Sequence, residues 1–505
     1  MAEIIDENSR TFGEFLLLPD LTTKNHTLDK VSLEIPLVKH ERGNPPPLKL
    51  RIPFVSAIMQ SVSDHNLAIA LAKEGGLSFI FHSQPIERQV EMIKKVKKHK
   101  AGFVVSDSNI SPDGTLKDVL QIVASTNHST VAVTVEGQPN GELVGLLTDK
   151  DYRDGVDNPD TRVSELMTPI SSLKYAYEGI DLENANEILW QEKLDCLPII
   201  DKQHHLTHLV FRKDYEDART NQSQLVDNQK RLLVGAGINT RDYRERVPEL
   251  VAAGADILCI DSSDGYSEWQ ADTIKFVKEE YNGQVLVGAG NVVASNGFLY
   301  LVEHGADFVK VGIGPGSICI TREQKGIGRG QASALVEISR TRDKYYQEKN
   351  VYIPICSDGG IFNDYQSVVA LAVGADFLMM GRYFARFNES PGNRVSIGGT
   401  LYKEYWAEGT NKASNWQRYE LGGESKLQFE EGVEGYVPFA GKLSDGIKGT
   451  IARIKSTFCN CGCLSIEELH RKARLVTVSS LSIRESGAHD VILNENVANN
   501  TRRRL

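Results

Sequence analysis

A seven-residue phrase of glycine, alanine, aspartate and four mostly apolar residues occurs three times in the 505-residue chain. The copies span 254–260, 305–311 and 374–380, and each follows an amphipathic stretch such as 247–253. Glycine at the end of a helix takes a left-handed turn, and a short apolar run after it is typical of a buried parallel strand. The three copies therefore predict repeated strand–helix units.

Five other apolar runs fit the same series. They lie at 54–58, 77–81, 232–236, 285–288 and 352–356. Eight parallel strands with intervening helices favour a (β/α)8 TIM barrel over an open sheet. The sequence therefore predicts an α/β protein built on such a barrel.

One gap in this series, between the second and third strands, is much longer than the others, at about 150 residues. The pattern inside it is doubled, with apolar runs at 130–134 and 143–151, then at 196–201 and 206–214. A domain inserted at a barrel loop is tolerated because the ends of the loop stay close together. We predict barrel segments at 1–100 and 221–505 and an inserted two-part domain at 101–220.

Composition narrows the functional class. The formal net charge is −10, whereas nucleic-acid-binding surfaces are usually basic. No apolar run reaches the roughly 18 residues of a membrane span, and the N-terminus lacks the basic start and apolar core of a secretory signal. Seven cysteines in a chain of this length suit a reducing compartment with free thiols. We expect a cytoplasmic protein with no nucleic-acid or membrane partner.

Polar residues follow several of the predicted strands, where a barrel places its active site. The acceptors at 261–264 follow the fourth strand and suit sugar hydroxyls. Glycines at 359–360 and 381 follow the seventh and eighth strands, and such glycines commonly hold a phosphate on backbone N–H groups. Asp358 is itself anionic, so a ribose diol suits it better than a phosphate does. These positions predict a ribose 5-phosphate ligand, and the alternative is that the glycines only turn the chain.

The loop after the sixth strand, 312–321, carries the strongest chemical signal. It contains three glycines and a proline, so it exposes carbonyl groups that suit a monovalent cation. It also presents Cys319 at the barrel mouth, whereas Cys259 and Cys356 lie within apolar strands and are predicted to be inert core residues. A thiolate at the mouth can add to an electron-poor carbon and act as a covalent catalyst.

This loop makes a family resemblance specific. The run Gly314-Pro-Gly-Ser-Ile-Cys-Ile-Thr-Arg322 resembles the catalytic signature of the IMP dehydrogenases. The resemblance covers nearly the whole chain, and the doubled insertion resembles a pair of CBS modules. The segment at about 400–450 contains Trp416-Gln-Arg-Tyr419 and corresponds to a mobile flap in that family.

The resemblance implies a reaction in two steps. Cys319 would attack carbon 2 of IMP, hydride would pass to NAD, and the thioimidate would be hydrolysed to XMP, the committed step of guanine nucleotide synthesis. Arg418, with Tyr419 beside it, would activate the water. Because arginine is normally always protonated, a relay through Thr321 and Glu431 stays open as an alternative.

The resemblance also implies the ligand contacts. Those to IMP would be Ser317, Asp358, Gly359, Gly360, Gly381, Arg382, Tyr405, Gly409 and Glu431. Those to NAD would be Asp261, Ser262, Ser263, Gly312, Ile313 and Gly314. A potassium ion would be held by Gly314, Gly316 and Cys319, with Glu485, Ser486 and Gly487 reaching in from a neighbouring chain of a homotetramer. The CBS pair could bind a purine nucleotide.

The chain departs from the family pattern in three places. It has Arg382 beside the phosphate glycine, Tyr-Trp-Ala-Glu-Gly at 405–409 instead of Tyr-Arg-Gly-Met-Gly, and Glu-Ser-Gly at 485–487 instead of Glu-Gly-Gly. Two other functions stay open. A GMP reductase shares the barrel and the cysteine loop, but that family is expected to lack the CBS pair and this flap. A CBS nucleotide sensor with an inactive barrel is disfavoured by Cys319, Thr321 and Arg418.

Overall fold

The computed structural model describes residues 2, 4–5, 7–99, 102–106, 108–126, 128–212, 223–227, 231–413, 429–487, 489 and 491. The chain divides into two compact units. The larger unit comprises Met1–Lys97, Ser223–Asp227 and Leu232–Leu505, and the smaller comprises Lys98–Gln222 and Asn228–Arg231. No helix among the described residues is long and apolar enough to cross a membrane.

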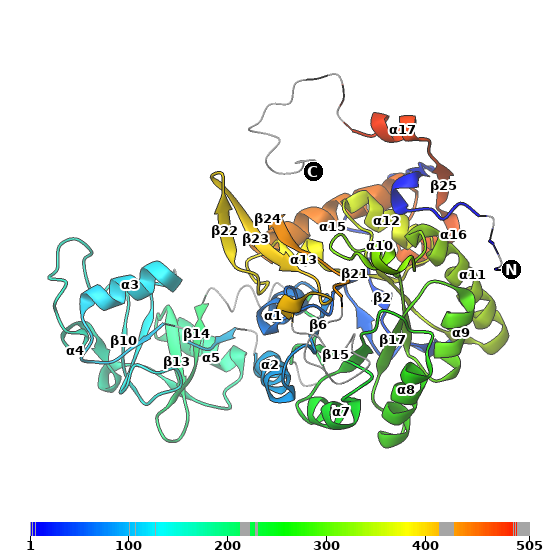
Figure 1. The fold of residues 1–505 in the computed structure, drawn as a ribbon. Helices are drawn as coiled ribbons and strands as arrows, with labels where there is room; N and C mark the ends of the chain where they lie inside the picture. The colour runs from blue at the N-terminus through cyan, green and yellow to red at the C-terminus, as the bar shows by residue number, and fades with distance from the viewer. Residues whose placement is uncertain are drawn as a thin grey trace. The chain divides into compact units, whose positions relative to one another are not determined.

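The larger unit contains a closed barrel of eight parallel strands, which confirms the predicted fold (Figure 1). In spatial order the strands are β15 (Gly235–Ile238), β16 (Ile257–Ile260), β17 (Val287–Val292), β18 (Phe308–Val311), β20 (Ile355–Asp358), β21 (Phe377–Met380), β5 (Phe54–Ser56) and β6 (Leu77–Ile80). Most of their residues are fully buried, as expected for parallel strands covered by helices.

Helices alternate with these strands around the barrel (Figure 1). The longer ones are α1 (His65–Lys73), α2 (Ile86–Lys98), α7 (Tyr243–Ala252), α8 (Glu268–Glu280), α9 (Ser295–Glu303), α11 (Gln331–Lys349), α12 (Asp364–Ala372) and α15 (Leu443–Asn460). Two short helices, α10 (Thr321–Lys325) and α13 (Arg382–Ala385), follow β18 and β21. After α13, a three-stranded antiparallel sheet is formed by β22 (Arg394–Ile397), β23 (Thr400–Trp406) and β24 (Glu434–Pro438).

Three predicted strands begin later than the sequence suggested, and the fifth begins at Val287 instead of at 285. The third begins at Gly235, because residues 232–233 instead pair with the linker at 225–226. The seventh begins at Ile355, because 351–352 form a separate strand, β19, that pairs with β3 (His40–Glu41). This strand also ends later than predicted, so that Asp358 is its last residue and not part of the following loop.

The smaller unit contains two four-stranded sheets. One has the order β11-β10-β9-β8 (Thr168–Pro169, Leu143–Leu147, Val131–Thr134, Asn109–Ile110), and the other has β12-β13-β14-β7 (Ala176–Tyr177, Cys196–Ile200, Leu206–Phe211, Phe103–Val104). The first strand of the unit, β7, pairs with β14 of the second sheet. The second sheet is therefore completed by a strand from the start of the unit, whereas the first sheet is built from four consecutive strands.

The aspartates of the repeated phrase link neighbouring barrel strands at their amino-terminal ends. Each one donates its backbone N–H to a residue just before or at the start of the preceding strand, and its carboxylate accepts the N–H of that same residue. The carboxylate bonds join Asp256 to Val234, Asp307 to Val287 and Asp376 to Ile355, at 2.8, 2.6 and 2.7 Å. We call each such pair of bonds a carboxylate clamp.

Each clamp also has its own cation. Asp256 pairs with Lys97 at 2.6 Å, Asp307 with Lys278 at 2.6 Å, and Asp376 with Arg342 at 3.0 Å. A buried carboxylate is costly unless it is both paired and hydrogen-bonded, and the clamps satisfy both conditions. They lie at the end of the barrel opposite the active-site end, where side chains serve stability.

We predict that Asp376→Asn lowers the free energy of unfolding by about 3–5 kcal/mol, because it removes the fully buried carboxylate from the Arg342 guanidinium and leaves only the exposed carboxylate of Asp343 as an ionic partner. Urea unfolding followed by circular dichroism measures the change. The control is Asp272→Asn, an exposed aspartate of α8, which should unfold at the urea concentration of the parent. Equal midpoints for both variants would contradict a structural role for the clamp.

Candidate active site

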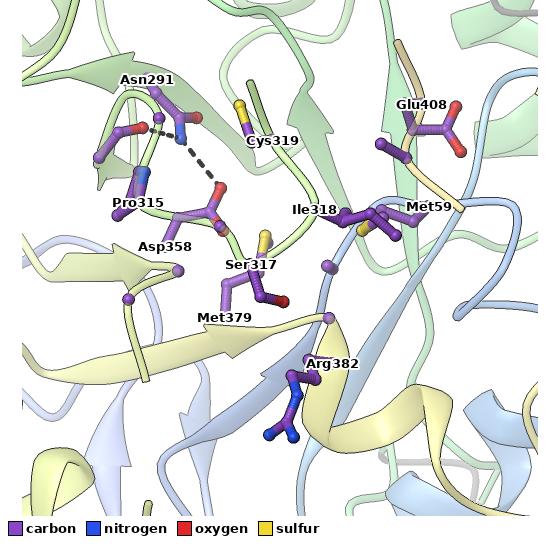
Figure 2. Close-up of a pocket in the computed structure, with 18 of the residues that line it drawn as sticks. Met59, Asn291, Pro315, Ser317, Ile318, Cys319, Asp358, Met379, Arg382 and Glu408 are labelled. Carbon is purple, nitrogen blue, oxygen red and sulfur yellow. Dashed lines mark hydrogen bonds between the residues drawn. The ribbon is translucent and has the colours of Figure 1, made fainter. Parts of the chain in front are cut away.

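A pocket lies at the carboxyl ends of the barrel strands (Figure 2). It brings together the predicted ligand and catalytic positions from four strand ends and from the segments that follow β23 and precede β24. Those that line it are Asp261, Ser262, Ser263, Gly312, Ile313, Gly314, Gly316, Ser317, Cys319, Thr321, Asp358, Gly359, Gly360, Gly381, Arg382, Tyr405, Gly409 and Glu431.

Five predicted positions remain, of which three are described and do not line this pocket. Arg418 and Tyr419 lie outside the described residues. Glu485 ends α17 (Ser480–Glu485), and Ser486 and Gly487 follow it. Within the described part of the chain, these three form hydrogen bonds to their own helix and to His489, and none to the loop around Cys319. The described residues also contain no group of three His, Cys, Asp or Glu side chains placed to hold a metal ion.

The loop 312–320, which we call the Cys319 loop, is fixed against a distant segment of the chain. Ile320 donates its N–H to the carbonyl of Glu431 at 2.9 Å, and Val433 donates to Ile318 at 3.0 Å. Cys319 thereby faces Gly432 in an antiparallel bridge. This pairing brings the Glu431 side chain beside the thiol, a proximity that no local pattern in the sequence reveals.

A continuous hydrogen-bonded path leads away from the thiol. Cys319 Sγ lies 3.1 Å from Thr321 Oγ1, which donates to Glu431 Oε2 at 3.1 Å. The second oxygen of Glu431 pairs with Lys325 Nζ at 2.5 Å. Thr321 and Lys325 lie one turn apart on α10, so that a single helical turn holds both carboxylate oxygens. Such a path can carry a proton between the thiol side of the pocket and a buried carboxylate.

The other two strand cysteines differ from Cys319, which is half-buried. Cys259 and Cys356 are fully buried in β16 and β20. Burial raises the pKa of the Cys259 thiol to about 12 and raises that of Cys356 well above its ordinary value. Both thiols therefore stay protonated and unreactive, as the sequence predicts.

Lys310 is a site residue that the sequence analysis missed. Its ammonium is fully buried in the barrel, 3.7 Å from Asp261 and 3.5 Å from Asp358. Burial alone would lower its pKa, but the charges of these carboxylates, led by Asp358, raise it above the ordinary lysine value. The signal was present in the repeat, because lysine occupies the position that holds Cys259 and Met379 in the other two copies.

Asn291, at the end of β17, is a second residue that the sequence analysis missed. Its amide nitrogen donates to the carbonyl of Gly312 at 2.6 Å and to Asp358 at 2.9 Å (Figure 2). Its amide oxygen is buried without a hydrogen-bond partner, although it lines the pocket. A buried unpaired acceptor is costly, so this atom is suited to a donor group on a ligand.

Three glycines and a buried tyrosine also line the pocket, and Gly359 and Gly360 lie close to Pro315 of the Cys319 loop. Gly359 and Gly360 adopt φ of +82° and +80°, which side chains rarely tolerate. A Cβ on Gly381 would lie 2.7 Å from the hydroxyl of Tyr405. Burial raises the pKa of Tyr405, so its phenol remains a neutral hydrogen-bond donor. Arg382 begins α13, and its side chain is directed away from Cys319 (Figure 2).

The segment 405–409, whose sequence differs from the family pattern, is held by Gln60, which follows β5. Trp406 donates its indole N–H to the side-chain oxygen of Gln60 at 3.0 Å, and Glu408 accepts the backbone N–H of Gln60. Burial raises the pKa of Glu408. The segment that carries Tyr405 and Gly409 is therefore attached to the rim of the barrel through Gln60.

Comparison with known proteins relates this site to a family. A sequence model described as the IMP dehydrogenase / GMP reductase domain matches residues 9–489. The chain is 57% identical to the inosine-5'-monophosphate dehydrogenase of Tritrichomonas foetus over 497 residues, which cover 98% of this chain and 99% of the relative. The enzymes of the same name from Aquifex aeolicus and Escherichia coli K12 are 37% and 33% identical, and cover 90% and 98% of this chain.

Solved structures correct one sequence argument. A GMP reductase variant from Trypanosoma brucei, crystallised with guanosine 5'-monophosphate, superimposes with a TM-score of 0.75 at 28% identity. The match covers 96% of this chain and 98% of the reductase. The expectation that GMP reductases lack the inserted unit is therefore wrong, and the insertion alone does not separate the two activities. By sequence and fold alike, the chain belongs to the IMP dehydrogenase / GMP reductase family.

Proposed function

We propose that this chain is an NAD-dependent IMP dehydrogenase, which converts IMP, NAD and water to XMP, NADH and a proton. The observation that carries the proposal is the Cys319–Thr321–Glu431 path at the mouth of a barrel whose other strand ends suit a ribose phosphate. The 57% identity to an inosine-5'-monophosphate dehydrogenase favours oxidation of IMP over reduction of GMP.

IMP would bind in the part of the pocket that is lined by the Cys319 loop and by Gly359, Gly360 and Gly381. Asp358 is oriented by Asn291 and Lys310, so that its carboxylate can accept the ribose hydroxyls. The backbone of Gly360 and Gly381 would receive the phosphate, together with Ser317, Tyr405 and Arg382. Gly409 and Glu431 would face the purine. Placing the ring at Cys319 in this way converts an encounter in solution into an intramolecular reaction.

The cofactor half of the pocket fits a dinucleotide. Asp261 is held by His82 at 3.2 Å and by Lys310, and Ser262 and Ser263 follow it, so that acceptors for ribose hydroxyls are in place. The Gly312–Gly314 backbone lines the same side. NAD, when bound, supplies the acceptor for the hydride that leaves carbon 2.

The reaction would proceed in two half-reactions, the first at Cys319 and the second with Arg418 and Tyr419 of the predicted flap. In the first, Cys319 Sγ forms a bond to carbon 2 of IMP, and loss of hydride leaves a thioimidate. In the second, water adds to that carbon and the C–S bond breaks. Arg418 and Tyr419 would activate the water, and the Thr321–Glu431 path offers a second route for its proton.

The proposal includes a potassium ion and a homotetramer. The carbonyls of Gly314, Gly316 and Cys319 lie in one tight loop, and the single chain leaves Glu485 to Gly487 free of it. A potassium site completed by a neighbouring chain of a homotetramer is consistent with both facts. The inserted unit, with its two four-stranded sheets, would be a CBS pair able to take a purine nucleotide.

We predict that Cys319→Ser binds IMP but forms no NADH, because a hydroxyl at neutral pH is a far weaker nucleophile than a thiolate. NADH absorbance measures turnover, and calorimetry measures IMP binding. Cys196→Ser, which changes the half-buried thiol of the smaller unit, serves as control and should retain full activity. Turnover of Cys319→Ser within about tenfold of the control would contradict covalent catalysis. Oxidation of a reduced nicotinamide cofactor by GMP, without activity on IMP, would instead make the chain a GMP reductase.

We predict that Arg418→Ala separates the two half-reactions. A general base typically contributes about 100- to 10,000-fold, so hydrolysis should slow by that factor while hydride transfer is nearly unchanged. Stopped-flow mixing with IMP and NAD should then give a burst of NADH near one equivalent per site. Mass spectrometry should detect the adduct on Cys319. If burst and steady rate fall together, Arg418 positions the substrate and the base lies at Thr321 and Glu431.

We predict that activity depends on potassium and is poorly supported by lithium, because a cage of backbone carbonyls accepts a large, weakly hydrated ion. Initial rates in matched chloride salts measure the effect. Equal rates in both salts would remove the ion from the mechanism.

A further inference from the structure

The Cys319 loop is supported from beneath by one arginine. Arg322 donates through Nε to the carbonyl of Ile313 at 3.0 Å and through Nη2 to the carbonyl of Arg329. A Cβ on Gly314 or Gly328 would lie 2.5 or 2.6 Å from this side chain, and both glycines have positive φ. Gly314 and Gly328 thus pack closely against the Arg322 side chain. Because Arg322 bonds to both Arg329 and Ile313, a shift of residue 329 would move the Cys319 loop.

Arg329 is the point at which several distant segments meet. Its guanidinium donates to the carbonyl of Val293, just after β17, at 3.0 Å, and pairs with Glu337 of α11. It also donates to Glu7, near the start of the chain, with an Nε–Oε1 distance of 3.0 Å. The Arg329 side chain is only 15% exposed, whereas Glu7 is 43% exposed. Glu7 thus completes an ion-pair cluster whose arginine is largely buried, whereas its two carboxylates, on Glu7 and Glu337, are partly exposed.

The residues after Glu7 continue along the start of α11. Gly330, which precedes the helix, has no side chain to cap it, and its N–H donates to Ser9 Oγ at 2.6 Å. The N–H groups of Ala332 and Ser333 donate to the carbonyl of Arg10 at 3.1 and 3.3 Å. The first N–H groups of a helix need such partners. The N-terminal segment 7–10 therefore acts as the cap of α11.

The first residue of the capped helix reaches into the barrel mouth. Gln331 donates to the carbonyl of Val311 at 2.7 Å and to Ser357 Oγ at 3.2 Å. A Cβ on Gly312 would lie 2.8 Å from its side-chain oxygen. Gln331 thus supports the first residues of the Cys319 loop and the strand that ends in Asp358.

We propose that Arg329, held by Glu7 of the N-terminal segment, is a positioning residue for the Cys319 loop. It touches no substrate atom, and it acts through Arg322 on Ile313 and through the start of α11 on Gln331. Loss of this hub leaves the loop free to shift, and a displacement of about 1 Å at reacting atoms can cost on the order of 100-fold in rate. The inference rests on the proposed function, because loop position matters only if Cys319 reacts.

The test compares Arg329→Met, Arg329→Lys and Glu7→Gln. A matched control is Arg51→Met, which breaks a 2.6 Å ion pair with Glu34 in the same unit, away from the pocket. All variants carry Cys196→Ser, because Cys196 and Cys319 are the two half-buried thiols among seven and the others are buried. The NADH burst rate is measured at saturating IMP and NAD. Alkylation of Cys319 by iodoacetamide is followed with and without IMP, at a temperature where melting curves show every variant folded.

Arg329→Met should lower the burst rate by about 10- to 100-fold and raise the IMP concentration that half-protects Cys319. Arg329→Lys should recover part of the loss, Glu7→Gln should give a smaller loss in the same direction, and Arg51→Met should match the parent. If the Arg329 variants melt earlier but keep burst rate and protection within about twofold of the parent, the cluster only stabilises the fold and the proposal is overturned.

If Arg329→Met does not fold, Arg329→Lys and Glu7→Gln decide by the same criteria. If the parent forms no NADH, the proposed function fails. The alkylation experiment still reports on the loop, because it needs only IMP binding beside Cys319. The two failures are thereby distinguishable.

Discussion

The carboxylate clamps between neighbouring barrel strands are the interaction on which the remaining structure depends. Each aspartate of the repeated phrase joins the amino-terminal end of one strand to the strand before it, through its backbone and its side chain. A parallel pair otherwise has evenly spaced backbone bonds with little to fix its register. The clamps fix that register at one end of the barrel. The strand ends at the other end, where Asp261, Asp358 and the Cys319 loop lie, consequently meet at defined heights.

At the active-site end of the barrel, one buried lysine pairs with two aspartates, whereas each clamp aspartate has its own cation. Lys310 is the buried cation between Asp261 and Asp358, which belong to the two halves of the pocket assigned to different ligands. A buried ion cluster contributes little net stability compared with apolar packing. Its value here is orientation, since carboxylates fixed before ligands arrive need no rearrangement during the reaction. The aspartates that stabilise the barrel therefore lie at the amino-terminal ends of the strands, and the pocket lies at their carboxyl ends.

The loop that carries Cys319 is held by backbone pairing and by the side chain of Arg322. Glycines with positive φ let the Cys319 loop pack on Arg322, and antiparallel pairing with 431–433 brings Glu431 to Thr321. The N-terminal segment, α11 and the region after β23 all contribute to one loop of nine residues. Such long-range support distinguishes Cys319, the proposed nucleophile, from Cys259 and Cys356, which are buried within their strands.

The sequence by itself determined the barrel, the inserted unit and most lining residues of the pocket. The reason is that strand periodicity, helix-ending glycines and the strand-end rule are local or repeated signals, and the signature around Cys319 is contiguous. The tertiary structure alone decided the start of β15 and β20, because competing pairings with 225–226 and with β3 lie far away in sequence. It alone revealed the roles of Lys310, Asn291 and the Arg329 hub, because these roles arise from contacts between segments that are distant in sequence, 67 residues apart for Asn291 and Asp358 and 322 for Arg329 and Glu7. Lys310 interrupts the apolar repeat and so left a signal in the sequence, but its partners Asp261 and Asp358 could be identified only from the structure.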